Sequence, residues 1–374
     1  MRLHDRYLFR ELLTPMSYCL GGFMAVWLSF FFFTKLDDMR EAKLHALDVL
    51  QFCLASLPEF FILVLPILLL LALLYALTHH ARHNEITALR AAGVGLWRLC
   101  VPYFIVGLLA GVVYFAMNEL AVPRCQQWTQ EILTRHLKPD ADSKTPTRFT
   151  SVDFHNVHAH RRWFIGEYDV PTATMFKPNA TWLLPDGTTR LFTAERGVHT
   201  NGTWTFFDAK MSLLIGKSGR PPAPIFSTNQ IAMPEFDETP KQIALAIKFR
   251  PAGGLLASRS ANIPLTDLWT YLRQNPDLPS KDTAPLLTKF HQRIAAPWTC
   301  LIVVLMAIPF GAQSGRRNLF FGVAGSIFIC FGYFVLQQVS LAFGLSGRIP
   351  GWLAAWLPNF IFAIVGIVLT LRVR

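Results

Sequence analysis

The stretch LPEFFILVLPILLLLALLYALTHHARHNEITALRAAGVGLWR, residues 57–98, decides the fold of this chain. It contains an almost charge-free apolar run, Phe60–Leu77, which is long enough to cross the hydrocarbon core of a bilayer. A hydrophilic, mostly basic patch follows, and Glu85–Gly93 then shows apolar residues at helical spacing and a glycine stop. The next apolar run begins near Leu99. The stretch therefore predicts two membrane spans joined by a short surface helix, at which a partner can apply force.

The composition indicates the class of protein. Of the 374 residues, 52% are hydrophobic and 16% are charged, which is too apolar for an ordinary soluble protein of this size. The net charge is +11, but much of the basic excess lies near the ends of apolar runs, and no basic motif interleaved with aromatic residues occurs. Membrane topology explains this charge, and we predict no nucleic-acid partner.

Metal and cofactor chemistry is not predicted. The six cysteines show no paired spacing, so neither a disulfide framework nor a zinc site is indicated. His155, His158 and His160 lie close together, but no carboxylate or cysteine completes a site, and we interpret them as solvated strand residues. No nucleotide-binding motif is complete either. We expect no catalytic residue, no metal and no cofactor, so the chain is not an enzyme and ATP hydrolysis must come from another chain.

Six apolar runs and a hydrophilic middle define the predicted domains. Residues 1–122 hold three spans with the surface helix at 83–93, and residues 289–374 hold three more. Residues 123–262 carry turn signals and short β-rich segments, which favour an antiparallel sandwich or jelly-roll, and residues 263–288 form a helix and linker. The predicted fold class is an α-helical membrane protein with six transmembrane helices and an inserted all-β, jelly-roll-like domain.

The expected elements are as follows. The predicted spans are residues 12–34, 54–77, 99–120, 294–310, 319–343 and 352–371, and the predicted strands are residues 148–154, 162–168, 189–193, 203–207, 211–215 and 225–231.

Basic residues predict the orientation in the membrane. With six spans, Arg2, Arg82, Arg316 and Arg372 fall on one side together with their basic neighbours. Positive charge is retained on the cytoplasmic side of a membrane, so both termini and the 83–93 bend are expected there. The β domain then lies on the opposite, extracytoplasmic side.

Several motifs in a fixed order resemble those of a known family. They are Asp5-Arg-Tyr7 before span one, Leu57-Pro58 opening span two, Asn84–Gly93 in the bend, Asn118–Pro123 after span three and Lys289–Arg293 before span four. Their order, the three-plus-three topology and the β insert together resemble the LptF/LptG permease family of the bacterial lipopolysaccharide export transporter. The C-terminal third is more similar to the LptG half than to the LptF half, and the sequence leaves this choice open.

The resemblance implies a bacterial inner-membrane protein with a periplasmic jelly-roll. It also implies partners: a heterodimer of LptF and LptG, a dimer of the ATPase LptB, and a jelly-roll relay to LptC and LptA. The implied function is extraction of lipopolysaccharide from the inner membrane and its transfer towards the outer membrane. A second hypothesis stays open, in which the chain is a scaffold that transmits ATPase motion to a periplasmic partner without handling lipid.

Glu85, with Arg82 and Arg90 beside it, is the predicted ATPase coupling site. The resemblance implies a coupling helix with a glutamate in this setting, received by a groove of the ATPase. A carboxylate near a helix N-terminus is stabilised by the helix dipole and can pair with a basic residue of a partner. The alternative is a solvated carboxylate that serves only as an N-terminal charge of the helix.

Lys35 is the predicted contact for the phosphates of lipid A. The resemblance implies a basic cluster at the outer end of an LptG-type first span; Lys35 matches it clearly, and Arg40 and Lys43 match it loosely. A contact of this kind near a membrane surface contributes about 1 kcal/mol. The alternative is a lysine that anchors the span at the membrane interface.

The aromatic faces of spans one and five are the predicted lining of an acyl-chain cavity. The residues are Trp27, Phe30 and Phe31 in the first span and Phe328 and Phe331 in the fifth. Moving acyl chains into water costs about 0.8 kcal/mol per methylene, so the chains must stay in an apolar pocket during extraction. Six spans are few to enclose a multi-chain lipid, and a second permease half is therefore expected. The alternative is ordinary lipid-facing surface.

Overall fold

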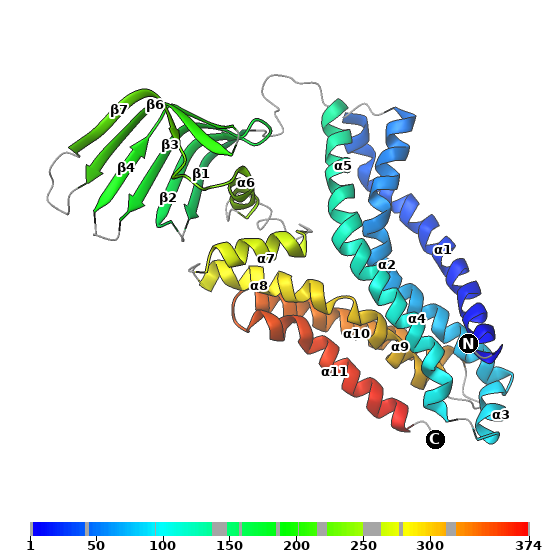
Figure 1. Cartoon of the computed structure of the whole chain (residues 1–374). Helices are drawn as coiled ribbons and strands as arrows, with labels where there is room; N and C mark the ends of the chain where they lie inside the picture. The colour runs from blue at the N-terminus through cyan, green and yellow to red at the C-terminus, as the bar shows by residue number, and fades with distance from the viewer. Residues whose placement is uncertain are drawn as a thin grey trace. The chain divides into compact units, whose positions relative to one another are not determined.

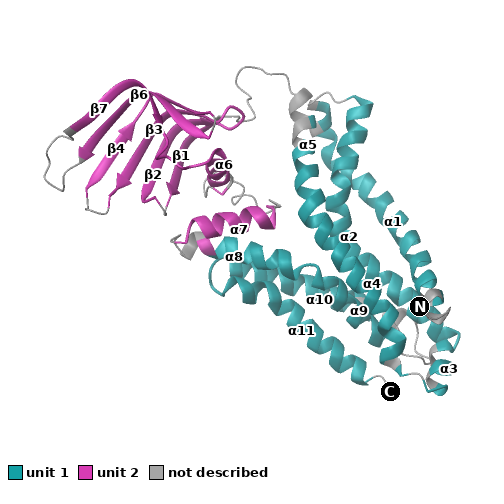
Figure 2. Ribbon diagram, in the orientation of Figure 1, with its two compact units in different colours: residues 1–138, 284–374 teal, residues 139–283 magenta. Residues whose placement is uncertain are grey.

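The computed structural model describes residues 3–41, 45–93, 95–136, 148–156, 159–184, 188–200, 202–214, 223–249, 263–276, 280–311 and 319–372. The chain divides into two compact units (Figure 2). Residues 1–138 and 284–374 form unit 1, which is helical, and residues 139–283 form unit 2, which is built on an antiparallel sheet (Figure 1).

Unit 1 is helical because its apolar segments have to satisfy their own backbone hydrogen bonds in a bilayer. In the described ranges five helices are long and apolar enough to span a membrane, and there are six if the bent pair Thr283–Ala295 and Trp298–Phe310 counts as one span. Its helices are α1 (Leu3–Glu41), α2 (Ala46–Arg82), α3 (Glu85–Ala91), α4 (Leu96–Ala116), the π-helical turn η1 (Met117–Ala121), α5 (Val122–His136), α8 (Ser280–Ala295), α9 (Trp298–Gly311), α10 (Leu319–Leu345) and α11 (Gly351–Arg372).

The core of unit 1 is centred on the contact between α2 and α9. Leu69 and Leu73 of α2 and Val304 of α9 are completely buried in one apolar cluster. Helix α4 packs closely on this core because Gly107 has no side chain; a Cβ atom there would lie 2.7 Å from Val304 Cγ2. The apolar window of α1, in contrast, is only 6% buried, against 67% for α2. The first span therefore keeps a long apolar face that the described part of the chain does not cover.

The fourth predicted span is a bent pair rather than one straight helix. Helices α8 and α9 meet at an angle of 52° next to Pro297, which has no N–H to continue the ladder of hydrogen bonds. Asn359 of α11 compensates, because its Nδ2 donates to the Ala295 carbonyl at 2.9 Å. Tyr333 donates to Asn359 Oδ1 at 2.7 Å and also shares a hydrogen bond with Thr299. This buried polar network attaches the break between α8 and α9 to α10, through Tyr333, and to α11, through Asn359.

Gly344 of α10 makes the tightest of these helix contacts, and Gly344→Ala is expected to destabilise the protein by about 1–3 kcal/mol through overpacking. An added Cβ would lie 2.4 Å from Ala354 Cβ and 2.8 Å from Thr288 Cγ2. Thermal unfolding of the purified full-length chain in detergent measures the loss. Gly332→Ala in the same helix is the matched control, since its nearest neighbour, Phe362 Cζ, lies 3.9 Å away. Equal effects of the two variants would contradict the predicted close packing.

Unit 2 contains a single antiparallel sheet in its described part. Its strands are β1 (Arg148–Asn156), β2 (Arg161–Asp169), β3 (Thr174–Leu183), β4 (Thr189–Thr193), β5 (Arg196–Thr200), β6 (Thr203–Leu214) and β7 (Ala223–Met233). β4 and β5 lie end to end between β3 and β6, so the rows follow one another in chain order, with β1 and β7 as the outer strands. Helices α6 (Pro240–Lys248) and α7 (Leu265–Gln274) complete the unit.

A crease runs across this sheet. Buried residues alternate along β2, β3 and β6, but at one level they are three apart, as with Phe206 and Ala209 in β6. Left-handed backbone at Ser151, Lys177 and Asp208, with φ of 54°, 47° and 52°, absorbs the additional residue in β1, β3 and β6. The pairing register is the same on both sides of these residues in β1–β2, β2–β3 and β6–β7, so neighbouring strands carry the additional residue together and keep the same face inward on both sides of the crease. The sheet therefore curves around its apolar core without exposing it.

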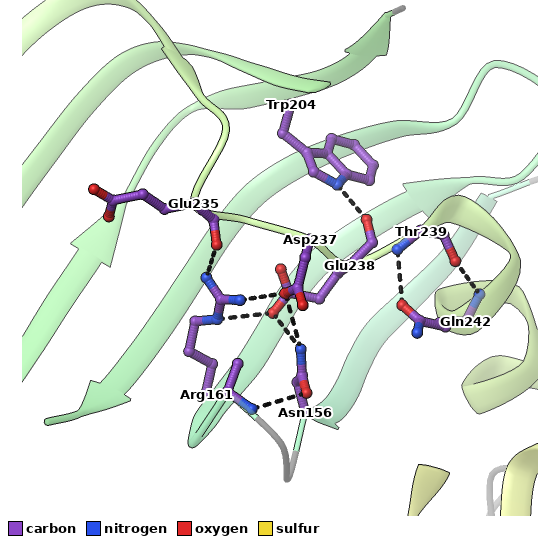
Figure 3. A network of polar contacts seen from close by, with 9 residues as sticks. Asn156, Arg161, Trp204, Glu235, Asp237, Glu238, Thr239 and Gln242 are labelled. Carbon is purple, nitrogen blue, oxygen red and sulfur yellow. Dashed lines mark hydrogen bonds and ion pairs between the residues drawn. The ribbon is translucent and has the colours of Figure 1, made fainter. Parts of the chain in front are cut away.

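An ion network, buried at Arg161 and Glu238 and exposed at Asp237, attaches the segment after β7 to the sheet (Figure 3). The Arg161 guanidinium, on β2, pairs with Asp237 and with Glu238, whose Oε1 lies 3.0 Å from Nε. Trp204 Nε1 donates to the Glu238 carbonyl at 2.6 Å. Arg161 also lies 5.1 Å from the Phe236 ring centroid, and Phe236 packs into the aromatic core. The network thus fixes the chain that leads into α6.

The structure differs from the sequence pattern in a few elements of the β region. Helix α5 occupies residues 122–136, at the start of the expected β domain, because span three continues through η1 without a stop signal. The pattern misses β3 and β5, since the crease interrupts their alternation and Pro178 lies inside β3. Segments 203–207 and 211–215 belong to one strand, β6, as far as residue 214.

Candidate functional site

The bend between α2 and α4 holds the seven-residue helix α3. Asn84 and Gly93 flank it in the left-handed conformation, with φ of 56° and 85°. Asparagine and glycine are the residues that adopt this conformation most readily, so both turns follow from the sequence. One side of α3 packs through Leu89 against Ala81 of α2 and Leu99 of α4. Among the side chains of α3 that the structure describes, Leu89 makes this apolar attachment and Glu85 makes a polar one.

The polar attachment is the carboxylate of Glu85. Its Oε2 lies 2.7 Å from Nδ1 of His80, and its Oε1 accepts from the Tyr7 hydroxyl at 3.5 Å. The His80 side chain is only 2% exposed, whereas that of Glu85 is 34% exposed. Glu11 of α1 adds a second carboxylate, 3.8 Å from His80 Nε2 and 3.2 Å from His79 Nε2. These side chains join α1, α2 and α3 at one end of the helices.

Tyr7 acts as a hydrogen-bond donor in this cluster throughout the physiological pH range. Its hydrogen bond to Glu11, followed by burial and by the negative charges of Glu11 and Glu85, raises the pKa of Tyr7 to about 12. The hydroxyl therefore stays protonated and available to the carboxylates. The sequence points to Glu85 but not to its neighbours in this cluster. Tyr7 and Glu11 belong to the distant helix α1 and His80 to the preceding helix α2, and none shares a local pattern with Glu85.

The two arginines predicted beside Glu85 are placed differently. Arg82, at the end of α2, is exposed. Arg90 lies in α3, and its side chain is outside the described part of the structure. Among the described side chains, the hydrogen-bond partners of Glu85 are His80 and Tyr7.

The predicted phosphate contacts lie at the other end of α1. Lys35 and Arg40 are exposed in its last turns. Lys43 falls outside the described residues. Both described cations are therefore at the solvent-exposed surface of the chain.

The predicted acyl-chain residues divide into two groups. Trp27 and Phe31 pack inside the chain, with Trp27 4.9 Å from Phe31 and 4.8 Å from Phe60 between ring centroids. Phe31 is only 7% exposed. Phe30, Phe328 and Phe331 are between 65% and 77% exposed and point away from the core. Only the second group is open to a lipid or a partner.

An ion pair that the site prediction missed links the two segments flanking residues 123–288. Arg293 of α8 donates to Glu119 Oε2 at 2.9 Å and to the Asn118 carbonyl at 3.2 Å, in the π-helical turn η1. Both side chains are largely buried, at 9% and 15% exposed. Both residues lie in the motifs Asn118–Pro123 and Lys289–Arg293, and their opposite charges are the sequence signal for the pair. The pair holds together the two helices through which the chain leaves and re-enters unit 1.

The described residues contain no group of three or more histidine, cysteine, aspartate or glutamate side chains placed to hold a metal ion. His155 and His160 are exposed, and His158 is outside the described ranges.

Comparison with known proteins then supplies the family. A family model described as lipopolysaccharide export system permease LptF/LptG matches residues 6–372, which is nearly the whole chain. The chain belongs to the LptF/LptG permease family. No curated protein matches it in the comparison made.

Membership in the LptF/LptG family agrees with the structure at a coarse level. The apolar helices of unit 1 are those of a multi-pass membrane protein, and unit 2 is a separate antiparallel β region. The members of this family are permease subunits of lipopolysaccharide export, not enzymes themselves. The match covers LptF and LptG together, and it does not separate the two.

Proposed function

We propose that the chain is a permease subunit that extracts lipopolysaccharide from the bacterial inner membrane, driven by a separate ATPase dimer of the LptB type. It passes the lipid to a periplasmic bridge of LptC- and LptA-type jelly-roll proteins. The observation that carries the proposal is the family match over residues 6–372. The same chain supplies a short helix for an ATPase at one end of its spans and exposed cations at the other end of α1.

The open faces of unit 1 support pairing with a homologous permease, in an LptF/LptG heterodimer. The α1 window is 6% buried and the α10 window, Ile327–Leu345, is 22% buried. Phe30, Phe328 and Phe331 are exposed on these two helices. A second half covering these faces would enclose an apolar cavity large enough for a multi-chain lipid, which a single set of spans cannot enclose.

The basic residues support an orientation with the α3 end in the cytoplasm. Arg82, Arg98 and Arg372 are exposed near helix ends, and loops on the cytoplasmic side are enriched in such residues. Both termini would then be cytoplasmic, and unit 2 would be periplasmic. In this orientation α3 meets the ATPase, and Lys35 lies at the depth of outer-leaflet phosphates.

The sheet of unit 2 supports a role in the bridge. Each of its outer strands, β1 and β7, pairs with one neighbour within the described sheet. A curved sheet with such edges resembles part of a jelly-roll and can be extended into a neighbouring protein by strand addition. The extended sheet would continue one apolar trough across several proteins.

Affinity purification of the tagged full-length chain from bacterial membranes tests the proposal. A homologous permease, a soluble ATPase and bound lipopolysaccharide are expected together, and the recovered permease also identifies whether the chain is LptG or LptF. Recovery of an ATPase and a periplasmic partner without lipopolysaccharide would favour the scaffold alternative. Recovery of neither a permease nor an ATPase would contradict both functions.

A photoreactive residue at position 35 is expected to crosslink lipopolysaccharide. The same probe at Tyr18, which is 76% exposed in the middle of α1, should capture bulk phospholipid and is the positional control. Arg40→Glu should weaken lipopolysaccharide capture at position 35 about fivefold, because one phosphate contact contributes about 1 kcal/mol. Capture of phospholipid alone at position 35 would show an interfacial anchor instead.

A further inference from the structure

We propose that His80 is a positioning residue that clamps α3 to the adjoining ends of α1 and α2, and that force applied to α3 reaches the spans through this clamp. The inference rests on the proposed function, in which α3 receives the ATPase. It concerns a residue that no motif pointed to and that touches neither lipid nor nucleotide.

Helix α3 needs such a clamp because of how it is connected. It is seven residues long, and the residues that flank it, Asn84 and Gly93, form turns with positive φ. A short helix between two turns changes its orientation under load unless contacts hold it at both ends. Leu89 provides an apolar contact towards its C-terminal end. At its N-terminal end the shortest contact is the 2.7 Å hydrogen bond between Glu85 and His80, beside the 3.5 Å bond from Tyr7.

The chemistry of His80 suits a fixed connection. A carboxylate only accepts hydrogen bonds, so the 2.7 Å contact with Glu85 assigns a proton to Nδ1 of His80. Hydrogen bonds to an ionised group are short and stronger than neutral ones, and low exposure to water strengthens them further. The ring is 2% exposed, so water competes little for this bond.

The second ring nitrogen faces a different helix. Nε2 lies 3.8 Å from Glu11 Oε2, which is too long for a hydrogen bond, so His80 makes no hydrogen bond to Glu11. Glu11 is also bound at 3.2 Å by His79, which does not depend on His80. Of the two contacts of His80, the one to α3 is therefore the stronger, and the two can be separated by substitution.

Two substitutions of His80 make this separation. In His80→Asn the amide nitrogen takes the position of Nδ1, one bond from Cγ, and keeps the donor towards Glu85. In His80→Gln the amide nitrogen takes the position of Nε2 and loses that donor. Hydrogen exchange of the amides in residues 85–91, measured on the purified full-length chain in nanodiscs, should accelerate about tenfold in His80→Gln, the effect of losing one hydrogen bond to a charged group. His80→Asn should exchange close to the wild-type rate.

Transport provides the second measurement. In the assembled complex, His80→Gln should release less lipopolysaccharide per ATP hydrolysed, and His80→Asn should restore the ratio. His83→Gln is the matched control, since His83 is exposed and its Nδ1 contacts the carbonyl of His79 in its own helix. Rescue by asparagine distinguishes a positioning role from a general loss of stability, which both substitutions would cause alike.

The outcomes separate the inference from the proposed function. Wild-type exchange in His80→Gln, or equal effects of the two variants, would overturn the clamp. Faster exchange with an unchanged ratio of lipid to ATP would overturn its role in carrying force. Exchange needs no ATPase, so failure of the wild-type chain to bind an ATPase would count against the proposed function alone.

Discussion

Glu85→Arg is expected to lower ATP-driven lipopolysaccharide transport at least tenfold while the protein stays inserted in the membrane. The substitution removes the 2.7 Å bond to His80 and reverses the charge that α3 presents to a partner. A hydrogen bond to a charged group contributes about 1.5–3 kcal/mol, which corresponds to roughly tenfold to a hundredfold in an equilibrium. Release of lipopolysaccharide from proteoliposomes, together with co-purification of the ATPase, measures the effect.

Two further variants interpret the result for Glu85. Glu85→Gln keeps an oxygen that accepts from His80 and removes the charge, so a mild defect would assign the role to the hydrogen bond and a severe defect to the charge. Glu59→Gln removes an exposed carboxylate of α2 and should behave as wild type. Full transport and normal co-purification by Glu85→Arg would show that Glu85 is only an N-terminal helix charge.

Arg161→Met is expected to give the largest loss of stability, about 3–5 kcal/mol in the free energy of unfolding of the sheet. It would leave the Glu238 carboxylate, which is completely buried, without its cation. It would also remove the cation stacked over Phe236. Hydrogen exchange of β2 and β6 amides in the full-length chain measures the loss.

The neighbouring residue is the control for Arg161. Arg162 pairs with Asp153 at 2.6 Å on the exposed face of the same strand, with 69% and 48% of the two side chains accessible. Exposed pairs contribute about 0–1 kcal/mol, so Arg162→Met should change little. Arg161→Met combined with Glu238→Gln should recover part of the loss, because the uncompensated charge is removed. Similar effects of the Arg161 and Arg162 variants would refute the buried network.

The apolar helices and the hairpin around residues 57–98 could be predicted because they depend on local sequence. A continuous apolar run predicts a span, and Asn84 and Gly93 predict the turns on either side of α3. Most strands of the β region could also be located, since turns and alternation are local too. The break at Pro297 could not be predicted in this way, because the hydrogen bond that stabilises it comes from Asn359, in the distant helix α11.

The candidate site also combines residues that the sequence identifies with partners that only helix packing brings together. The family resemblance points to Glu85 at the start of the short helix and to Lys35 at the end of the first span, and both roles stay predictions. The partners of Glu85 could not be identified in this way, because Tyr7 and Glu11 come from α1 and meet α3 only when the helices pack. For the same reason Phe30 and Phe31 look alike in sequence, but packing buries Phe31 and leaves Phe30 65% exposed.

The sequence by itself therefore determined the class of protein, its spans, the inserted β region and the short helix in the bend, since each follows from hydrophobicity and turn chemistry along the chain. Only the tertiary structure decided which side chains satisfy the carboxylates: His80 bonds Glu85, and the cations Arg293 and Arg161 pair with Glu119 and Glu238. The physical reason is that the cost of burying a charge is met by an opposite charge in space. For Glu119 and Glu238 the sequence separation to that charge, 174 and 77 residues, carries no information about the distance between the two side chains.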